Sequence, residues 1–390
     1  MAEIGTGAAP GADARPGSPA KAGLPVTGGL PAAGGPAALR REAAGGARGP
    51  RQMAPRAQAG GRGPIAALDL GTNNCRLLIA RRVGGADSDF QVIDAFSRIV
   101  RLGEGLLQSG RLSDAAMDRA IVALGACADK LQRRGVIQVR SVATEACRRA
   151  ENGPAFVRRV YEETGLALDV ITPAEEARLA VLGCQTLIDR QARRTLVFDI
   201  GGGSTEVVLL ERSKGRGTDE ASVRMDSWIS VPWGVVSLGE TEPLDAGNPV
   251  NRLEAYQRMK GRVTQHLAPL KRRLKGEVQL LGASGTVTTL ASLNMGLPQY
   301  DRRLVDGSLA STAELVALSH DLALKSPAER AAVPGIGADR ADLVVAGAAI
   351  LEALIELGTA PQLRVADRGI REGILRSMIA RDGQNGMARP

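Results

Sequence analysis

Two segments of the chain share a pattern that suits phosphate binding: an apolar strand, an aspartate near its end and a glycine-rich turn. They are Ala66–Arg76 (AALDLGTNNCR) and Leu196–Glu206 (LVFDIGGGSTE). Backbone N–H groups of such turns can approach phosphate oxygens closely, because glycine has no Cβ. The two aspartates, Asp69 and Asp199, are 130 residues apart, so each copy can occupy its own domain. The repeat predicts two phosphate-binding loops facing a common cleft.

The second copy is the stronger signal, because Ser204 and Thr205 add two hydroxyl donors to the glycines Gly201, Gly202 and Gly203. For a single loop of this kind, a tight turn with a positive φ angle is an equal alternative. A third glycine-rich turn, at 282–286, follows a predicted strand at 278–281. Three such loops in one chain favour phosphate binding over turn geometry alone.

Carboxylates are the main candidates for catalysis and metal binding. The chain has only two histidines, outside any metal-ligand or Ser/His pattern, and four scattered cysteines without a Cys-x-x-Cys pair. A hard, oxygen-liganded ion such as Mg²⁺ is therefore expected, with Mn²⁺ as an alternative. Asp69 and Asp199 at strand ends are its expected ligands, although each could instead cap its turn. Glu206 is expected to face the same cleft.

Two adjacent glutamates begin a predicted helix after Thr172 in a capping-box pattern. Glu175 is expected to return the capping hydrogen bond, which leaves Glu176 free near the helix N-terminus. A solvated surface position is the alternative for Glu176. Arg148 follows a strand end, where it could bind phosphate with two parallel hydrogen bonds. Arg76 lies in the first loop motif, with a surface strand position as its alternative.

Composition predicts an α/β protein behind a disordered tail. The chain has 390 residues, of which 44% are hydrophobic, enough for two or three domains. Residues 1–62 are rich in Ala, Gly and Pro and predict disorder. Alternating strands and helices predict α/β domains at 63–188 and 189–380, followed by unstructured residues 381–390. With no signal-peptide pattern and no membrane-spanning run, a cytoplasmic location is expected.

The charge favours an anionic partner. The formal net charge is +8, and the segment through Gly61 carries seven basic against three acidic side chains. Aromatic residues are only 2% of the chain, and no nucleic-acid motif is present, which argues against nucleic acid. The oligomeric state stays open, with a homodimer among the options.

Taken together, these motifs resemble the exopolyphosphatase/guanosine pentaphosphate phosphatase family. The resemblance covers residues 65–376 and implies the fold of the actin, hexokinase and sugar-kinase superfamily: two related, ribonuclease-H-like α/β domains around a central cleft. It rests on six blocks in order: DLGTN at 69–73, AT at 143–144 with Arg148 and Asn152, EEAR at 175–178, DIGGGSTE at 199–206, GASGT at 282–286 and GIREG at 369–373.

The resemblance also implies an activity: Mg²⁺-dependent release of terminal orthophosphate from inorganic polyphosphate, or from guanosine pentaphosphate (pppGpp) in the stringent response. Glu176 matches the family's catalytic base, Asp199 and Glu206 match acids that position metal and water, and Asp69 matches the first-loop acid. The expected phosphate-binding residues are Thr72, Asn73, Arg148, Gly201, Gly202, Gly203, Ser204, Thr205, Gly285 and Thr286.

Alternatives on the same fold are a weakly catalytic alarmone- or nucleotide-binding regulator and a sugar kinase or chaperone ATPase, which would lack the glutamate pair. The chain departs from the family pattern at Asn74-Cys75, where the family often has Ser and an aliphatic residue, and at the Thr172-Pro173-Ala174 lead-in. It resembles the short, two-domain form of the family.

Overall fold

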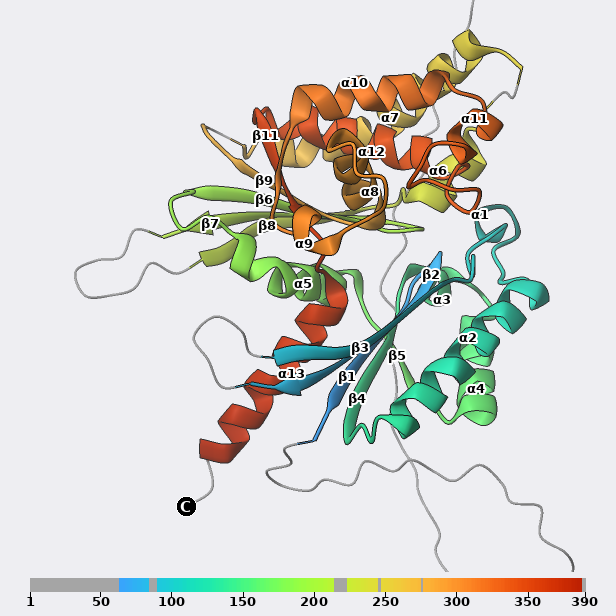
Figure 1. The fold of residues 1–390 in the computed structure, drawn as a ribbon, viewed down its shortest axis with the longest axis vertical. Coiled ribbons are helices and arrows are strands. Elements are labelled where there is room, and N and C mark those ends of the chain that lie inside the picture. Colours follow the sequence, from blue (N-terminus) through green and yellow to red (C-terminus); the bar gives the residue numbers. More distant parts are fainter. Residues whose placement is uncertain (1–62, 84–89, 214–222, 245–246, 275, 388–390) are drawn as a thin grey trace, which may run out of the picture. The chain divides into compact units, whose positions relative to one another are not determined.

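The structure, a computed structural model, describes residues 63–83, 90–213, 223–244, 247–274 and 276–387. These residues lie in one compact unit built on two mixed β-sheets with helices on their faces (Figure 1). The predicted tail at 1–62 lies outside the described residues. Within the described part, no helix is long and apolar enough to span a membrane.

The first sheet contains the first copy of the repeat. Its strand order is β3-β2-β1-β4-β5. The first three strands pair antiparallel through short connections, whereas β4 and β5 are parallel to β1 and follow helical crossovers. The strands are β1 (Ile65–Leu70), β2 (Asn74–Arg82), β3 (Phe90–Ile99), β4 (Gln138–Ala143) and β5 (Leu168–Val170).

The second sheet repeats this topology. Its order is β10-β11-β9-β6-β7-β8, so that β6 takes the place of β1, and β10 is an added antiparallel edge strand. The predicted α/β class and the internal repeat are confirmed. The strands are β6 (Arg194–Ile200), β7 (Thr205–Arg212), β8 (Val223–Val231), β9 (Gln279–Ala283), β10 (Leu309–Ser311) and β11 (Gln362–Ala366).

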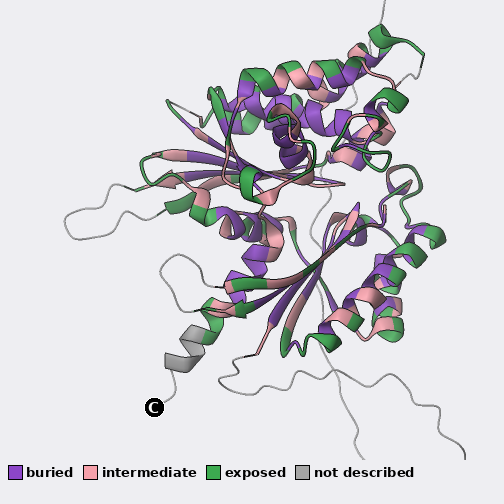
Figure 2. Cartoon of the chain, in the orientation of Figure 1, coloured by how far each residue is buried: buried purple, intermediate pink, exposed green. Residues whose placement is uncertain are grey.

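Helices cover both sheets. The residues along the strands and on the helix faces that pack against them are buried (Figure 2). Ser113 caps α2, its hydroxyl oxygen accepting a hydrogen bond from the Ala116 N–H. The helices are α1 (Leu106–Ser109), α2 (Asp114–Arg133), α3 (Glu145–Arg149), α4 (Gly153–Thr164), α5 (Pro173–Cys184), the 3-10 helix η1 (Gln185–Leu187), α6 (Val235–Thr241), α7 (Pro249–Lys271), α8 (Gly285–Asn294), α9 (Arg302–Val305), α10 (Thr312–Leu324), α11 (Pro327–Ala331), α12 (Val344–Gly358) and α13 (Ile370–Met387).

Two helices, α5 and α13, cross between the sheets with their backbones in close contact. A Cβ added to Gly183 would lie 2.0 Å from the Gly369 carbonyl oxygen, and one on Gly373 would lie 2.0 Å from that of Leu179. At both crossing points glycine allows a contact that any side chain would prevent.

The last helix packs on the first sheet, although the sequence-based boundary at 189 groups it with the second half. Ile374, Leu375 and Met378 of α13 are buried against β1 and β2. In turn, α5 buries Ala177 and Cys184 against the second sheet. We call the first sheet with residues 100–105, α2 and α4 the first lobe, and the second sheet with α6, α7, α8, α10 and α12 the second lobe.

The prediction that residues 381–390 are unstructured is wrong for 381–387, where α13 continues to Met387. The polar composition of this stretch suggested a tail. In the structure Asp382 forms an ion pair with Arg82 of β2, which ties this end of the helix to the first sheet.

Candidate active site

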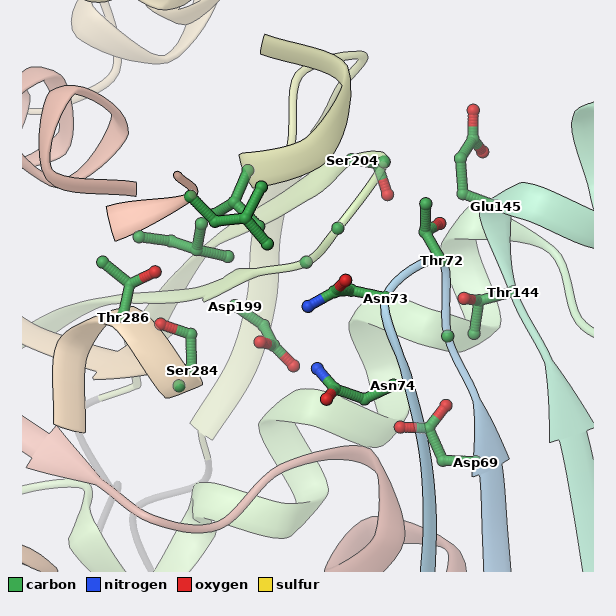
Figure 3. Close-up of a pocket in the computed structure, with 18 of the residues that line it drawn as sticks. Asp69, Thr72, Asn73, Asn74, Thr144, Glu145, Asp199, Ser204, Ser284 and Thr286 are labelled. Carbon is green, nitrogen blue, oxygen red and sulfur yellow. The ribbon is translucent and has the colours of Figure 1, made fainter. Parts of the chain in front are cut away.

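The main cleft lies where the two halves of the repeat meet. Together with its opening to solvent it has a volume of about 1030 Å³, and it is lined by residues of all three glycine-rich turns. Asp69, Asn73, Asn74 and Asp199 point into the same space, with Ser284 and Thr286 on the opposite wall (Figure 3). The tertiary structure therefore brings the predicted loops together.

The first two loops have the same turn geometry. In the first, the Gly71 N–H donates to the Asn74 carbonyl oxygen at 2.9 Å, and in the second the Gly201 N–H donates to that of Ser204 at the same 2.9 Å. Each turn directly follows a strand that carries the aspartate. The repeat seen in the sequence is thus preserved in backbone hydrogen bonding.

The glycine run of the second loop serves close approach rather than a left-handed backbone. Among the described residues, the glycines with positive φ do not include Gly201, Gly202 or Gly203. A Cβ on Gly202 would lie 2.8 Å from the Thr72 Cβ, and one on Gly203 would lie 2.8 Å from the Thr72 hydroxyl oxygen. The second loop is therefore packed directly against the first.

Two neighbouring hydroxyls of the second loop face different ways. Ser204 lines the cleft and donates to the Glu206 carboxylate at 2.8 Å. Thr205 is fully buried, and its hydroxyl donates to the Trp233 carbonyl oxygen at 2.7 Å, away from the cleft lining. Thr205 begins β7 and Glu206 follows it into the cleft lining, as expected because successive side chains of a strand point to opposite faces.

The third loop begins helix α8. Ser284, Gly285 and Thr286 all line the cleft. The Ser284 hydroxyl oxygen accepts from the Val287 N–H at 3.0 Å and so caps the helix. The helix N-terminus points its free N–H groups towards the cleft, an arrangement that suits an anion.

Glu176 lies at the N-terminus of α5, lines the cleft and is only 5% exposed. Thr172 caps the helix by accepting from the Glu175 N–H at 3.2 Å. The expected return bond from the Glu175 carboxylate is replaced by contacts to Arg140 and Arg178. Glu175 is thus structural, though with other partners than predicted, and Glu176 is the carboxylate that faces the cleft.

The predicted phosphate ligand Arg148 contacts the candidate base instead of lining the main cleft. Its guanidinium donates to Glu176 at 3.2 and 3.3 Å, to Glu145 at 2.6 Å and to the Ile171 carbonyl oxygen at 2.7 Å. These bonds hold the Glu176 carboxylate in place, and phosphate binding by Arg148 stays a prediction.

The carboxylates of the cleft share a strongly perturbed environment. Burial raises the pKa of Glu176 well above its usual value, the nearby Glu206 charge raises it further, and Arg148 opposes the rise. Burial and Glu206 together raise the pKa of Asp199 to about 7, and burial raises the pKa of Glu206 to about 7. Such clustering of perturbed acids in a cleft is typical of functional sites.

Asp69 adds a further acid at the end of β1. Burial raises its pKa, while Arg76 and Arg371 lower it. Its Oδ1 atom is buried without a hydrogen-bond partner among the described residues. An unpaired buried carboxylate oxygen of this kind can accept a cation or a water molecule.

Several cleft residues were missed or undervalued by the sequence reasoning. Arg76 lines the cleft instead of lying on a solvent-facing part of its strand. Arg340 lines the cleft from the turn before α12. Arg340 donates to the Thr289 hydroxyl oxygen at 3.0 Å. Glu145 also lines the cleft. The only local sequence feature that could have drawn attention to Arg340 is the glycine-rich stretch at 335–337 just before it. That stretch lacks the strand and aspartate that precede the first two loops.

Comparison with known proteins agrees with this geometry. A profile of the Ppx/GppA phosphatase family matches residues 78–382. The chain belongs to the Ppx/GppA phosphatase family. It is 32% identical over 326 residues to exopolyphosphatase 2 of Mycobacterium tuberculosis, a match covering 80% of this chain and 98% of the relative.

Solved structures give the same result for the fold. A Ppx/GppA family member from Aquifex aeolicus is 30% identical with a TM-score of 0.65, and the match covers 82% of this chain and 98% of that one. An exopolyphosphatase from Cytophaga hutchinsonii is 26% identical with a TM-score of 0.71, covering 81% and 98% respectively. The predicted two-domain α/β fold is confirmed, and the family assignment identifies the chain as a phosphoanhydride hydrolase.

Proposed function

We propose that the protein is an exopolyphosphatase, which releases terminal orthophosphate from inorganic polyphosphate. The observation that carries this proposal is the buried Glu176 carboxylate, which faces a cleft whose other walls are three glycine-rich turns. Relatives named as exopolyphosphatases match nearly the whole folded part of the chain.

In this proposal Glu176 accepts a proton from the water that attacks the terminal phosphorus. The water oxygen forms the new P–O bond as the bridging P–O bond breaks, and the shortened chain leaves with the electron pair. Arg148 keeps the Glu176 carboxylate oriented through its two hydrogen bonds. The backbone N–H groups of the loops, with Arg76 and Arg340 in the lining, would hold the phosphoryl oxygens.

The acids of the cleft fit a hard divalent cation such as Mg²⁺. Burial raises the pKa values of Asp199 and Glu206, the Glu206 charge raises that of Asp199 further, and Asp69 presents an unpartnered buried oxygen. No ready-made group of three or more acidic, His or Cys ligands occurs among the described residues. A bound Mg²⁺ would take one or two of these carboxylates and complete its shell with water and phosphate oxygens. When bound, it would neutralise negative charge on the phosphates.

Glu176→Gln tests the role of the proposed base. It keeps the size and removes the proton acceptor, so kcat should fall at least about 100-fold while the protein still folds. Glu175→Gln is the matched control, because that carboxylate pairs with Arg140 and Arg178 outside the cleft lining. Phosphate release and thermal unfolding measure the two effects. Near-normal turnover of Glu176→Gln would remove Glu176 from the mechanism.

Substrate choice is tested by phosphate release from polyphosphate and from pppGpp, side by side, with and without Mg²⁺. A higher kcat/KM on polyphosphate is expected. Preference for pppGpp would place the activity on the alarmone instead. Binding of pppGpp without turnover of either substrate would indicate a regulator rather than an enzyme.

A further inference from the structure

A segment of the first lobe, residues 100–105, is hydrogen-bonded to the first phosphate loop. The Val100 and Arg101 N–H groups both donate to the Asn73 carbonyl oxygen, at 2.8 and 3.0 Å, and the Gly103 N–H donates to that of Thr72 at 2.9 Å. Arg101 has a φ of 47°, a left-handed backbone that a non-glycine residue rarely adopts. The segment is therefore held in one particular shape by the loop that it supports.

A helix of the second lobe is attached to the second phosphate loop in the same way. The Val235 and Val236 N–H groups at the start of α6 donate to the Gly201 and Gly202 carbonyl oxygens at 3.0 and 2.8 Å. The Ser237 hydroxyl donates to the Gly203 carbonyl oxygen at 3.1 Å. These three hydrogen bonds attach the start of α6 to the second loop.

Two contacts join residues 100–105 to the second lobe, one to the turn before α12 and one to α6. Arg101 pairs with Asp342 at 2.8 and 3.4 Å and also donates to the Asp339 carbonyl oxygen at 3.3 Å. The Gly105 N–H donates to a carboxylate oxygen of Glu240 on α6 at 2.8 Å. We call Arg101, Gly105, Glu240 and Asp342 the clasp.

The clasp also borders a second cavity next to the main cleft. This space, of about 590 Å³, is lined by Arg101, Glu240 and Asp342. Asn73 and Leu343 line both cavities, so the clasp lies beside the phosphate site rather than at a remote surface. Separation of the clasp residues would widen the cleft on this side.

We propose that Arg101 and Glu240 are positioning residues, and that the clasp sets the distance between the two phosphate loops and opens when a polyphosphate chain enters or leaves. The loops contact each other through Gly202 and Thr72, so a small rotation of one lobe separates them. The clasp contacts lie on loops and helix ends, where hydrogen bonds can break without unfolding either sheet. The kinetic part of this proposal rests on the proposed hydrolysis, and the structural part does not.

The distance between the lobes can be measured directly by double electron–electron resonance. All four native cysteines are buried, so spin labels can be directed to Cys residues introduced at Val122 and Val250, which are 63% and 62% exposed on α2 and α7. The unmodified clasp should give one dominant distance. The Arg101→Ala/Glu240→Ala variant should shift the ratio of open to closed molecules at least about fivefold and give a second, different distance.

Kinetics on polyphosphate provide the second readout. Since saturating substrate can restore closure, the double variant should raise KM about fivefold while kcat stays within about twofold. Exchange of the charges in Arg101→Asp/Asp342→Arg should bring KM back towards the parent value. Asp tolerates the left-handed backbone at position 101.

Arg159→Ala is the matched control, because Arg159 is 37% exposed, similar to the 34% of Arg101, and pairs with Asp118 and Glu163 within the first lobe. It should change neither distance nor KM. A clasp variant with the parent's distance distribution would overturn the proposal whatever its activity. An inactive parent with the expected distance change would refute the proposed function and leave the clasp intact.

Discussion

The two halves of the cleft share one sequence pattern but carry opposite charges opposite the aspartate, on the neighbouring strand. Asp69 on β1 lies opposite Arg76 on β2, and 130 residues later Asp199 on β6 lies opposite Glu206 on β7. In the first half Arg76 lowers the pKa of Asp69, whereas in the second half Glu206 raises the pKa of Asp199. The second half therefore concentrates negative charge, and we call it the cation half; in the first half Arg76 offsets the charge of Asp69, and we call it the anion half.

The loops themselves differ in a complementary way. The first loop presents the side chains of Thr72 and Asn73, and the second leaves space for them with Gly202 and Gly203 at the corresponding positions. The repeat has diverged so that the two turns fit together. Experiments that change one half at a time can test this asymmetry.

The largest effect is expected from the cation half. Glu206→Gln should lower kcat at least about 100-fold and abolish the thermal stabilisation by Mg²⁺, because it removes a negative charge beside Asp199. Arg76→Gln, at the equivalent position of the other half, should keep that stabilisation. Phosphate release and thermal unfolding with and without Mg²⁺ measure both. Equal loss of Mg²⁺ stabilisation in both variants would contradict the assignment of charges.

A smaller effect is expected from one methyl group in each loop. Gly202→Ala should lower kcat/KM about tenfold or more, because its Cβ would lie 2.8 Å from the Thr72 Cβ and 3.0 Å from the Asn73 nitrogen. In Gly71→Ala the new Cβ would lie 3.5 Å from the Asn74 carbonyl oxygen, which is an ordinary contact. The kcat/KM of this variant should therefore stay within about threefold of the parent value. Steady-state kinetics of the two variants decide the comparison, and equal effects would refute the interlocking of the loops.

The anion half should respond mainly in substrate binding. Arg76→Ala should raise KM for polyphosphate about tenfold with a smaller change in kcat, since a charged hydrogen bond contributes roughly 1.5–3 kcal/mol. Arg98→Ala, on the neighbouring strand β3 and stacked on Phe96, is the control. A fall in kcat with unchanged KM would show that Arg76 acts in the transition state instead.

The smallest effect concerns stability without metal. Asp199 and Glu206 have folded-state pKa values of about 7, above the ordinary 3.8 and 4.5, so the folded state binds more protons than the unfolded state between these values. The free energy of unfolding should therefore fall as the pH rises from 5 to 8 in EDTA, with the loss levelling off above about pH 7. Urea unfolding at both pH values measures it. Glu206→Gln should flatten the slope, and an unchanged slope would place its origin elsewhere.

Much of the fold was predictable because local patterns agreed with the tertiary arrangement. The strands that carry Asp69 and Asp199 near their ends lie where the sequence places them, and so does the glutamate pair after Thr172. Strand propensity, capping and turn chemistry act over a few residues, so they can be read from a few residues.

Other features depend on contacts between distant segments. Arg340 enters the cleft through the packing of the turn before α12, and the packing of α13 on the first sheet joins chain ends about 300 residues apart. The hydroxyls of Ser204 and Thr205 have different partners, Glu206 in the cleft and the Trp233 carbonyl oxygen away from it, which the hydroxyl pattern alone does not reveal. Arg148 matched a phosphate-binding position, yet its guanidinium is held by Glu176 and Glu145.

The sequence by itself determined that the chain repeats a strand, an aspartate and a glycine-rich turn, and that carboxylates must carry the chemistry. Those are properties of residue type and short-range spacing. Only the tertiary structure decided that Gly202 faces Thr72, that Glu176 shares a cleft with Asp199 and Glu206, and that the clasp joins the two loops. Burial, like-charge proximity and contacts across the lobes exist only once the two sheets are packed together, and they set the proton affinities and the geometry of the site.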